Sequence, residues 1–256
     1  MTTIREPAVA GMFYPGDAGE LRTTIHAFMD CTPAQPGPAP KALIAPHAGY
    51  VYSGPVAASA YASLYPHRDQ YTRVVLLGPS HRVPVRNLAT SSADVFRTPL
   101  GDVPVDREAI AAVNMPEMAV LEAAHQLEHS LEVHLPFLQV VLGSFTLVPL
   151  VVGDATPDSV ARLLDRLWGG PETLIVVSSD LSHYLAYDEA VNQDRRTCEA
   201  IERLDESGIG YDDACGATPV RGLLVAARRR AMQVKTLDLR NSGDTAGGRD
   251  RVVGYG

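Results

Sequence analysis

Cysteine is scarce in this sequence. Among its 256 residues only Cys31, Cys198 and Cys215 carry a thiol, and they are odd in number and far apart. They form neither a disulfide framework nor a paired-thiolate zinc motif. A chain of this length needs no such staples, because it can bury a sizeable core as one α/β domain. The cysteine pattern therefore fits a reducing compartment.

A surplus of basic charge and a long apolar run are also missing. The net charge is −8, and the basic residues are dispersed apart from Arg228–Arg230, so the sequence lacks the electrostatic footprint of a nucleic-acid-binding protein. The N-terminal 17 residues contain charges and prolines where a signal peptide has an apolar core. No run approaches the roughly 20 apolar residues of a membrane span. We expect a cytoplasmic protein without nucleic-acid or membrane partners.

The motifs of several common enzyme classes are absent as well. The G-x-S-x-G nucleophile elbow, the G-x-x-x-x-G-K-[ST] phosphate loop and the dinucleotide fingerprint do not occur. Ser178, Ser179 and Ser182 lie near Asp180 and His183, but residues so close in sequence seldom assemble a catalytic triad. Serine hydrolysis and nucleotide binding are therefore unsupported.

Three apolar, strand-like runs each end in groups that can exchange protons or bind a metal. His47 follows the run ALIA, His81 follows VVLLG, and Asp180 and His183 follow LIVV. In open α/β sheets the carboxyl ends of parallel strands meet in one crevice, which is where such folds keep their sites. The pattern predicts one site at one end of a sheet. The alternative is that each histidine merely hydrogen-bonds to loop backbone.

The remaining pattern predicts an α/β fold, a single domain over residues 1–256 with a central, largely parallel or mixed sheet flanked by helices. A strand, a helix and a strand over 145–177 imply a parallel right-handed unit. Short β-like pieces within 82–105 favour a hairpin. The other predicted elements are helices over 18–29, 106–115, 156–168, 187–204 and 219–232, and strands over 233–239 and 252–256.

The segment 123–141 contains three histidines and two glutamates. If 126–142 is mainly helical, about 100° per residue places His129 and Glu132 on one face and His134 on the other. A helical face with His and Glu three residues apart can bind a metal or support its ligands. It can equally be a solvated face.

Two histidines and a carboxylate form the set that holds iron(II) while leaving positions open for oxygen and substrate. His47 and His81 are the first two candidate ligands, and Asp180 or Asp244 is the third. His183 is then free to act as general acid or base, because an imidazole titrates near neutrality. Two neighbours of these groups are candidates to line the site, namely Tyr50 and Ser80.

Seven stretches together resemble the Memo family, known in bacteria as AmmeMemoRadiSam system protein B. They are PAVAGMFYPGD, APHAGYVYSGPVAASAY, LLGPSH, EHSLEVHLPFLQ, LVPLVVGD, VVSSDLSHY and VVGYG, in the expected order along nearly the whole chain. This family is similar in fold to class III extradiol ring-cleaving dioxygenases, which are non-haem iron enzymes. The resemblance implies that His47 and His81 bind metal, that Asp180 and His183 belong to the cleft, and that His183 is the acid/base.

The third metal ligand is where the sequence departs from its relatives. Animal members have a cysteine in the loop after the last helix, and the dioxygenases have a glutamate. This chain has LRNSGDTAGG there, with Ser242, Asp244 and Thr245 near the expected place. If Asp244 substitutes, the harder ligand favours iron(II) over copper(I). Copper, or no tightly bound metal, are the alternatives.

Two functions follow from the resemblance. One is a metal-dependent oxidoreductase with a dioxygenase-like cleft that acts on a small substrate. The other is a module that binds a peptide or protein in the same cleft without chemistry. In bacteria the family name also implies a radical S-adenosylmethionine protein and an AMMECR-type protein as partners.

Overall fold

A six-stranded sheet forms the centre of the protein in the computed structural model, which describes residues 2–33 and 36–256. Its strand order is β2-β9-β3-β8-β4-β7. All neighbouring pairs are parallel except β4 and β8, which are antiparallel. The strands are β2 (Ala42–Ala45), β9 (Thr173–Ser178), β3 (Arg73–Pro79), β8 (Thr146–Val152), β4 (Leu88–Thr90) and β7 (Met118–Val120).

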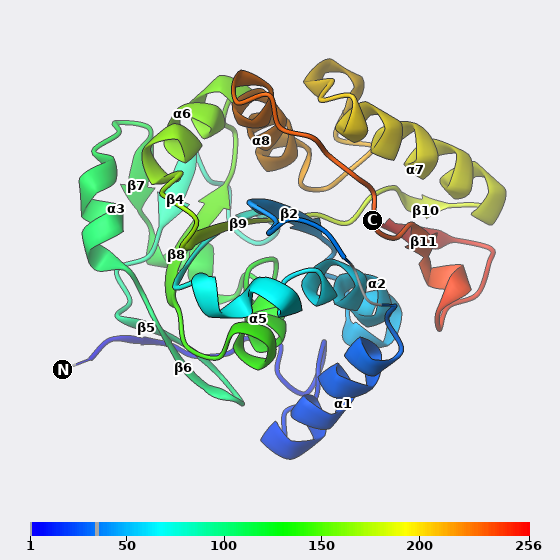
Figure 1. The fold of residues 1–256 in the computed structure, drawn as a ribbon, viewed down its shortest axis with the longest axis horizontal. Coiled ribbons are helices and arrows are strands. Elements are labelled where there is room, and N and C mark those ends of the chain that lie inside the picture. Colours follow the sequence, from blue (N-terminus) through cyan, green and yellow to red (C-terminus); the bar gives the residue numbers. More distant parts are fainter. Residues whose placement is uncertain (1, 34–35) are drawn as a thin grey trace.

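Helices cover both faces of this sheet, with α6 and α8 on one side and α2 and α5 on the other (Figure 1). Strands buried on both faces read as continuous apolar runs, and every residue of β9 is buried. The helices are α1 (Ala18–Asp30), α2 (Tyr50–Ala62), α3 (Arg107–Val113), α4 (Glu122–Gln126), α5 (Leu135–Leu142), α6 (Pro157–Leu167), α7 (Tyr187–Glu202) and α8 (Ala217–Arg229). Short 3-10 turns are η1 (Tyr65–Gln70), η2 (Glu132–His134), η3 (Glu206–Gly208) and η4 (Ser242–Asp244).

Two three-stranded sheets flank the central one. The first has the order β1-β5-β6 and contains β1 (Ile4–Arg5), β5 (Val95–Thr98) and β6 (Gly101–Pro104). The second has the order β10-β12-β11 and contains β10 (His183–Leu185), β12 (Val252–Tyr255) and β11 (Arg240–Asn241). The antiparallel β5–β6 pair confirms the predicted hairpin, and β12 confirms the predicted terminal strand.

The fold class is therefore the α/β architecture predicted from the sequence, and its mixed sheet agrees with the dioxygenase-like fold that the resemblance implied. The starts of three helices follow from their capping residues. Asp17, Asp106 and Thr156 each accept a hydrogen bond from a backbone N–H of the first turn. Among the described residues no helix combines the length and apolar character needed to cross a membrane.

Two predicted elements differ from the structure. The helix expected over 126–142 is interrupted, because α4 ends at Gln126 and a loop precedes η2 and α5. In that loop the Glu128 carboxylate binds the backbone N–H groups of His129 and Ser130 and so replaces helical hydrogen bonds. The strand expected over 233–239 is also wrong, since that segment pairs with no other strand and β11 begins only at Arg240.

Two buried histidines make stability depend on pH. Burial lowers the pKa of His134 from 6.5 to about 3 and that of His125 to about 4. Because an unfolded chain protonates these imidazoles near pH 6.5, it binds more protons than the folded protein below that pH. Acidification through this window therefore favours the unfolded state.

We predict that the free energy of unfolding falls as the pH is lowered from 7 to 5, as measured by urea unfolding. His134→Gln keeps a hydrogen-bond acceptor for Tyr61 but removes one titrating group. It should reduce the pH slope by up to ~1.4 kcal/mol per pH unit. His26→Gln, at an exposed position of α1, should leave the slope unchanged. Equal slopes for wild type and His134→Gln would contradict the buried neutral state of this ring.

Candidate metal centre

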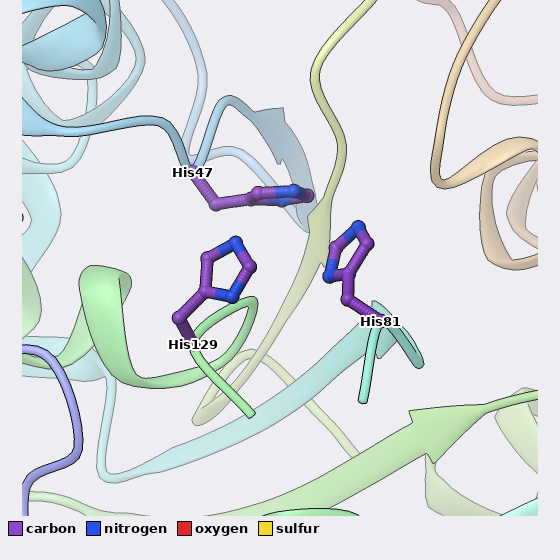
Figure 2. A group of neighbouring side chains, drawn as sticks. All are labelled: His47, His81 and His129. Carbon is purple, nitrogen blue, oxygen red and sulfur yellow. The ribbon is translucent and has the colours of Figure 1, made fainter. Parts of the chain in front are cut away.

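Three histidines converge at the carboxyl end of the central sheet (Figure 2). One ring nitrogen from each of His47, His81 and His129 lies within 4.8 Å of the others. His47 follows β2 and His81 follows β3, whereas His129 comes from the loop between α4 and η2. The sequence predicted the first two as ligands and His129 as a residue that can bind a metal or support its ligands, and the structure brings all three together.

The proton of the neutral His47 ring is fixed by its neighbours. Ser178 Oγ donates its hydrogen to the carbonyl oxygen of Ser130 at 2.6 Å, so it accepts from His47 Nδ1, also at 2.6 Å. The lone pair of His47 is therefore on Nε2. Burial, followed by the neighbouring His81 and His129, lowers the pKa of His47 well below its usual value. The ring stays neutral at physiological pH, which is the form that binds metals.

A buried glutamate lies beside the other two histidines and forms a hydrogen bond with the ring of His81. Glu128 Oε1 accepts from His81 Nδ1 at 2.9 Å and lies 3.4 Å from His129 Nδ1. The same carboxylate accepts from the backbone N–H groups of His81, His129 and Ser130. Burial acts to raise the pKa of Glu128, but the hydrogen bonds from His81 and Ser130 and the charge of His81 together lower it to about 2. A carboxylate behind a histidine is the usual device that fixes the ring of a metal ligand.

Asp180 contacts the backbone of His47 and lies near its Nε2 atom. Its Oδ1 accepts from the backbone N–H groups of His47 and Ala48 at 2.7 and 3.3 Å, and its Oδ2 lies 4.0 Å from His47 Nε2. Burial raises the pKa of this carboxyl, while the hydrogen bonds from His47 and Ala48 and the charge of His183 oppose that rise. Asp180 therefore presents a free oxygen beside the nitrogen that would face a metal.

His183 begins β10, where its ring is solvent-exposed. Its Nδ1 lies 2.8 Å from the carbonyl oxygen of Leu181. Since a carbonyl can only accept, the neutral ring carries its proton on Nδ1 and leaves Nε2 free to take up a proton. The charge of His183 lowers the pKa values of both His47 and Asp180.

The other candidates from the sequence lie elsewhere. Asp244 accepts from the Tyr187 hydroxyl at 2.5 Å and from Asn241 N in the capping box of η4, and it does not belong to the histidine group. Glu132 is fully buried in an ion pair with Arg5. Tyr50 is a core residue, because its ring packs on Phe137. The Ser80 hydroxyl donates to the carbonyl of Val83, in the turn that carries His81.

Sequence reasoning missed two residues of the site. Glu128 immediately precedes His129, but nothing in its spacing shows that it binds His81, which is 47 residues away. Cys215, between η3 and α8, has its Sγ 3.4 Å from His47 Nε2 and accepts a hydrogen bond from Asp180 N at 3.3 Å. Only the C-G pair before an apolar helix could have drawn attention to it.

Comparisons with known proteins identify the family of this chain. The family model described as "Memo-like protein" matches residues 5–256. A MEMO1 family protein of Methanopyrus kandleri is 38% identical over 281 residues, which cover 98% of this chain and 96% of the relative. MEMO1 family proteins of Ignicoccus hospitalis and Aquifex aeolicus are 39% and 36% identical, cover 98% of this chain, and are themselves covered to 96% and 97%. The chain belongs to the Memo family.

Proposed function

We propose that this protein is a metal-dependent oxidoreductase that holds its ion with His47, His81 and His129 and acts on a small substrate. The observation that carries the proposal is the convergence of three imidazoles at one end of the sheet. At His47 and His81 a hydrogen bond donated by Nδ1 leaves the lone pair on Nε2, the nitrogen that would bind the ion. Polar groups gathered in this way at strand ends are hard to explain by packing of the core.

The donor set fits a divalent transition metal. Imidazole suits zinc, copper, iron and nickel, and a set of three leaves coordination positions open. We propose iron(II), with copper as the alternative, and iron(II) when bound would supply one-electron and oxygen chemistry. His129 takes the ligand position for which the sequence had offered Asp180 or Asp244.

The protein's own residues then divide the remaining tasks. Glu128 orients His81 by accepting a hydrogen bond from its Nδ1, and its carboxylate lies 3.4 Å from His129 Nδ1. Asp180 Oδ2 lies beside the open side of His47, where it can accept a proton or a hydrogen bond from a bound substrate. His183 exposes Nε2 to solvent and can exchange protons between substrate and water.

A non-catalytic role is the second candidate, in which the same place binds a peptide or partner protein. Its support is two exposed aromatic side chains, Tyr52 and Tyr184, which are 41% and 69% exposed. Tyr184 follows His183 directly and has a φ of 60°, a backbone conformation that bulky residues adopt rarely and mostly at functional sites. Tyrosine is a common anchor in protein interfaces.

Metal content tests the first proposal. We expect protein purified anaerobically and loaded with iron(II) to hold one ion per chain by elemental analysis. The double variant His47→Ala/His81→Ala and the single variant His129→Ala should lose it, because each removes imidazole ligands. Asp244→Asn should retain it, because Asp244 binds Tyr187 instead. His183→Ala should also retain the ion but lose turnover in a screen of catechols.

Two results would contradict this proposal. Absence of metal from the loaded wild type would favour the binding module. Loss of metal from Asp244→Asn together with its retention by His129→Ala would return the third ligand to the C-terminal loop.

Thiol reactivity tests whether Cys215, beside His47, carries a neutral thiol. Burial, followed by the charge of Asp180, raises the pKa of Cys215 to about 12, and burial raises that of Cys198 to about 11. Both thiols are therefore protonated and unreactive near neutrality. We predict that iodoacetamide at pH 8 labels the exposed Cys31 alone in the native metal-free protein, and all three thiols in urea. Cys31→Ser should abolish fast labelling, as measured by mass spectrometry. Fast labelling of Cys215 would contradict the protonated, buried state of its thiol.

A further inference from the structure

A single buried arginine holds the loop that carries His129. Arg5 is 6% exposed and comes from β1. Its Nε donates to the carbonyl oxygen of His125 at 3.0 Å, a second nitrogen donates to that of Glu128 at 2.6 Å, and the third forms an ion pair with Glu132. One guanidinium thus contacts residues 125, 128 and 132, on both sides of His129.

Glu132 completes this connection by gathering the N-terminal segment around it. Its carboxylate is fully buried and accepts from the backbone N–H groups of Ala8 and Val9 at 2.8 and 3.0 Å. It also accepts from the Tyr14 hydroxyl at 2.5 Å. Together with Arg5, four donors from residues 5–14 therefore converge on one carboxylate.

The same N-terminal segment also touches two of the histidine-bearing loops directly. The ring of Phe13 lies 4.8 Å from the ring of His129, centroid to centroid. The Phe13 carbonyl oxygen accepts from Tyr50 N at 2.7 Å, three residues after His47. Residues 5–14 therefore connect the loop of His47 with the loop of His129.

The loop of His129 needs such support because its own backbone does not fix it. Residues 127–131 lie between α4 and η2, outside any helix or strand. Their conformation depends on side-chain contacts from Glu128 and Arg5. Arg5 binds the carbonyl oxygen of His125, which is 120 residues away in the sequence. A ligand on a loop is placed only as accurately as the contacts that hold the loop.

The chemistry of the Arg5–Glu132 ion pair also favours a role in fixing the geometry of this loop. A buried ion pair contributes little net stability, since desolvation of the two charges offsets their attraction, and apolar replacements of the pair are often neutral or stabilising. Arginine differs from lysine in presenting a planar fork of donors, which can bind several acceptors at once. A fork that binds two carbonyl groups and one carboxylate is suited to fixing geometry.

We propose that Arg5 and Glu132 are positioning residues of the metal centre. They fasten residues 125–132 to the N-terminal segment, so that His129 and Glu128 stand in place before an ion arrives. This inference rests on the proposed function, because it concerns how the same three histidines bind their ion. It gives the first 14 residues of the chain a role in metal affinity.

The test compares Co²⁺ binding by wild type and by Arg5→Met/Glu132→Leu. This double variant removes both charges at once, so no buried charge is left unpaired, although Ala8 N, Val9 N and the Tyr14 hydroxyl lose their acceptor. We expect the Kd for Co²⁺ to rise by about 10-fold or more, the size of effect typical for residues that support metal ligands. We also expect the visible d–d spectrum of bound Co²⁺ to change, because the position of His129 changes. A purely structural role would lower the thermal stability of the metal-free protein and leave the spectrum as it is.

A matched control removes a charge pair that touches neither the N-terminal segment nor the histidines. Arg162→Met/Glu117→Leu eliminates the ion pair between α6 and the residue before β7, whose Nη2 and Oε1 atoms are 2.8 Å apart. Its Kd and spectrum should equal those of wild type. Arg5→Lys is the second variant, in case the double variant does not fold. It keeps the charge opposite Glu132 but cannot bind both carbonyl groups in the same way, so its Kd should also rise.

The outcomes separate the two proposals. If wild type binds Co²⁺ and both Arg5 variants that fold bind it with unchanged Kd and spectrum, the positioning role is overturned and the proposed function stands. If wild type itself binds no Co²⁺, both are overturned. A raised Kd with an altered spectrum, at a melting temperature within a few degrees of the control variant, supports the positioning role.

Discussion

The parallel pairing of β2, β9 and β3 is the constraint on which the rest of this structure depends. Backbone hydrogen bonds align the three strands so that all of them end at the same edge of the sheet. His47, Asp180 and His81 follow these ends, so their proximity results from strand register. A slip by one residue would exchange the side chains on the two buried faces of β9 and disrupt their packing, so packing of the core also fixes the site.

Around this edge the protein buries several charges that would each be costly if left unpaired. Asp180 accepts hydrogen bonds from two backbone N–H groups. Glu128 accepts from the side chain of His81 and from the backbone N–H groups of three residues. Glu132 is bound by Arg5 and Tyr14, among others. Such hydrogen bonds compensate for the loss of water. The same hydrogen bonds also connect loops that no regular secondary structure joins. The contacts that satisfy the buried charges therefore also hold the residues of the site in position.

The sequence predicted those parts of the site that depend on local pattern. His47, His81 and Asp180 could be found because each follows a strand-like apolar run, and parallel strands share one end. His129 was placed on a helical face, but the helix does not form there, because Glu128 and Arg5 bind the backbone that helical hydrogen bonds would use. Cys215 contacts His47, 168 residues away, and Glu128 contacts His81, 47 residues away. The spacing of residues along the chain does not reveal such contacts. Asp244 does not join the three histidines, and its carboxylate takes part in a local capping box.

The arrangement has a consequence for the charge of the proposed centre. Three neutral imidazoles leave a divalent ion with its full charge, whereas a carboxylate ligand would cancel part of it. Here the carboxylates stand outside the ligand set, with Glu128 behind His81 and Asp180 with its Oδ2 4.0 Å from His47 Nε2. A carboxylate near a buried cation would stabilise it, and a carboxylate that is not a ligand would leave the open positions of the ion to substrate. A site built in this way attracts an anionic or ionisable oxygen ligand more strongly than one in which a carboxylate occupies the third position.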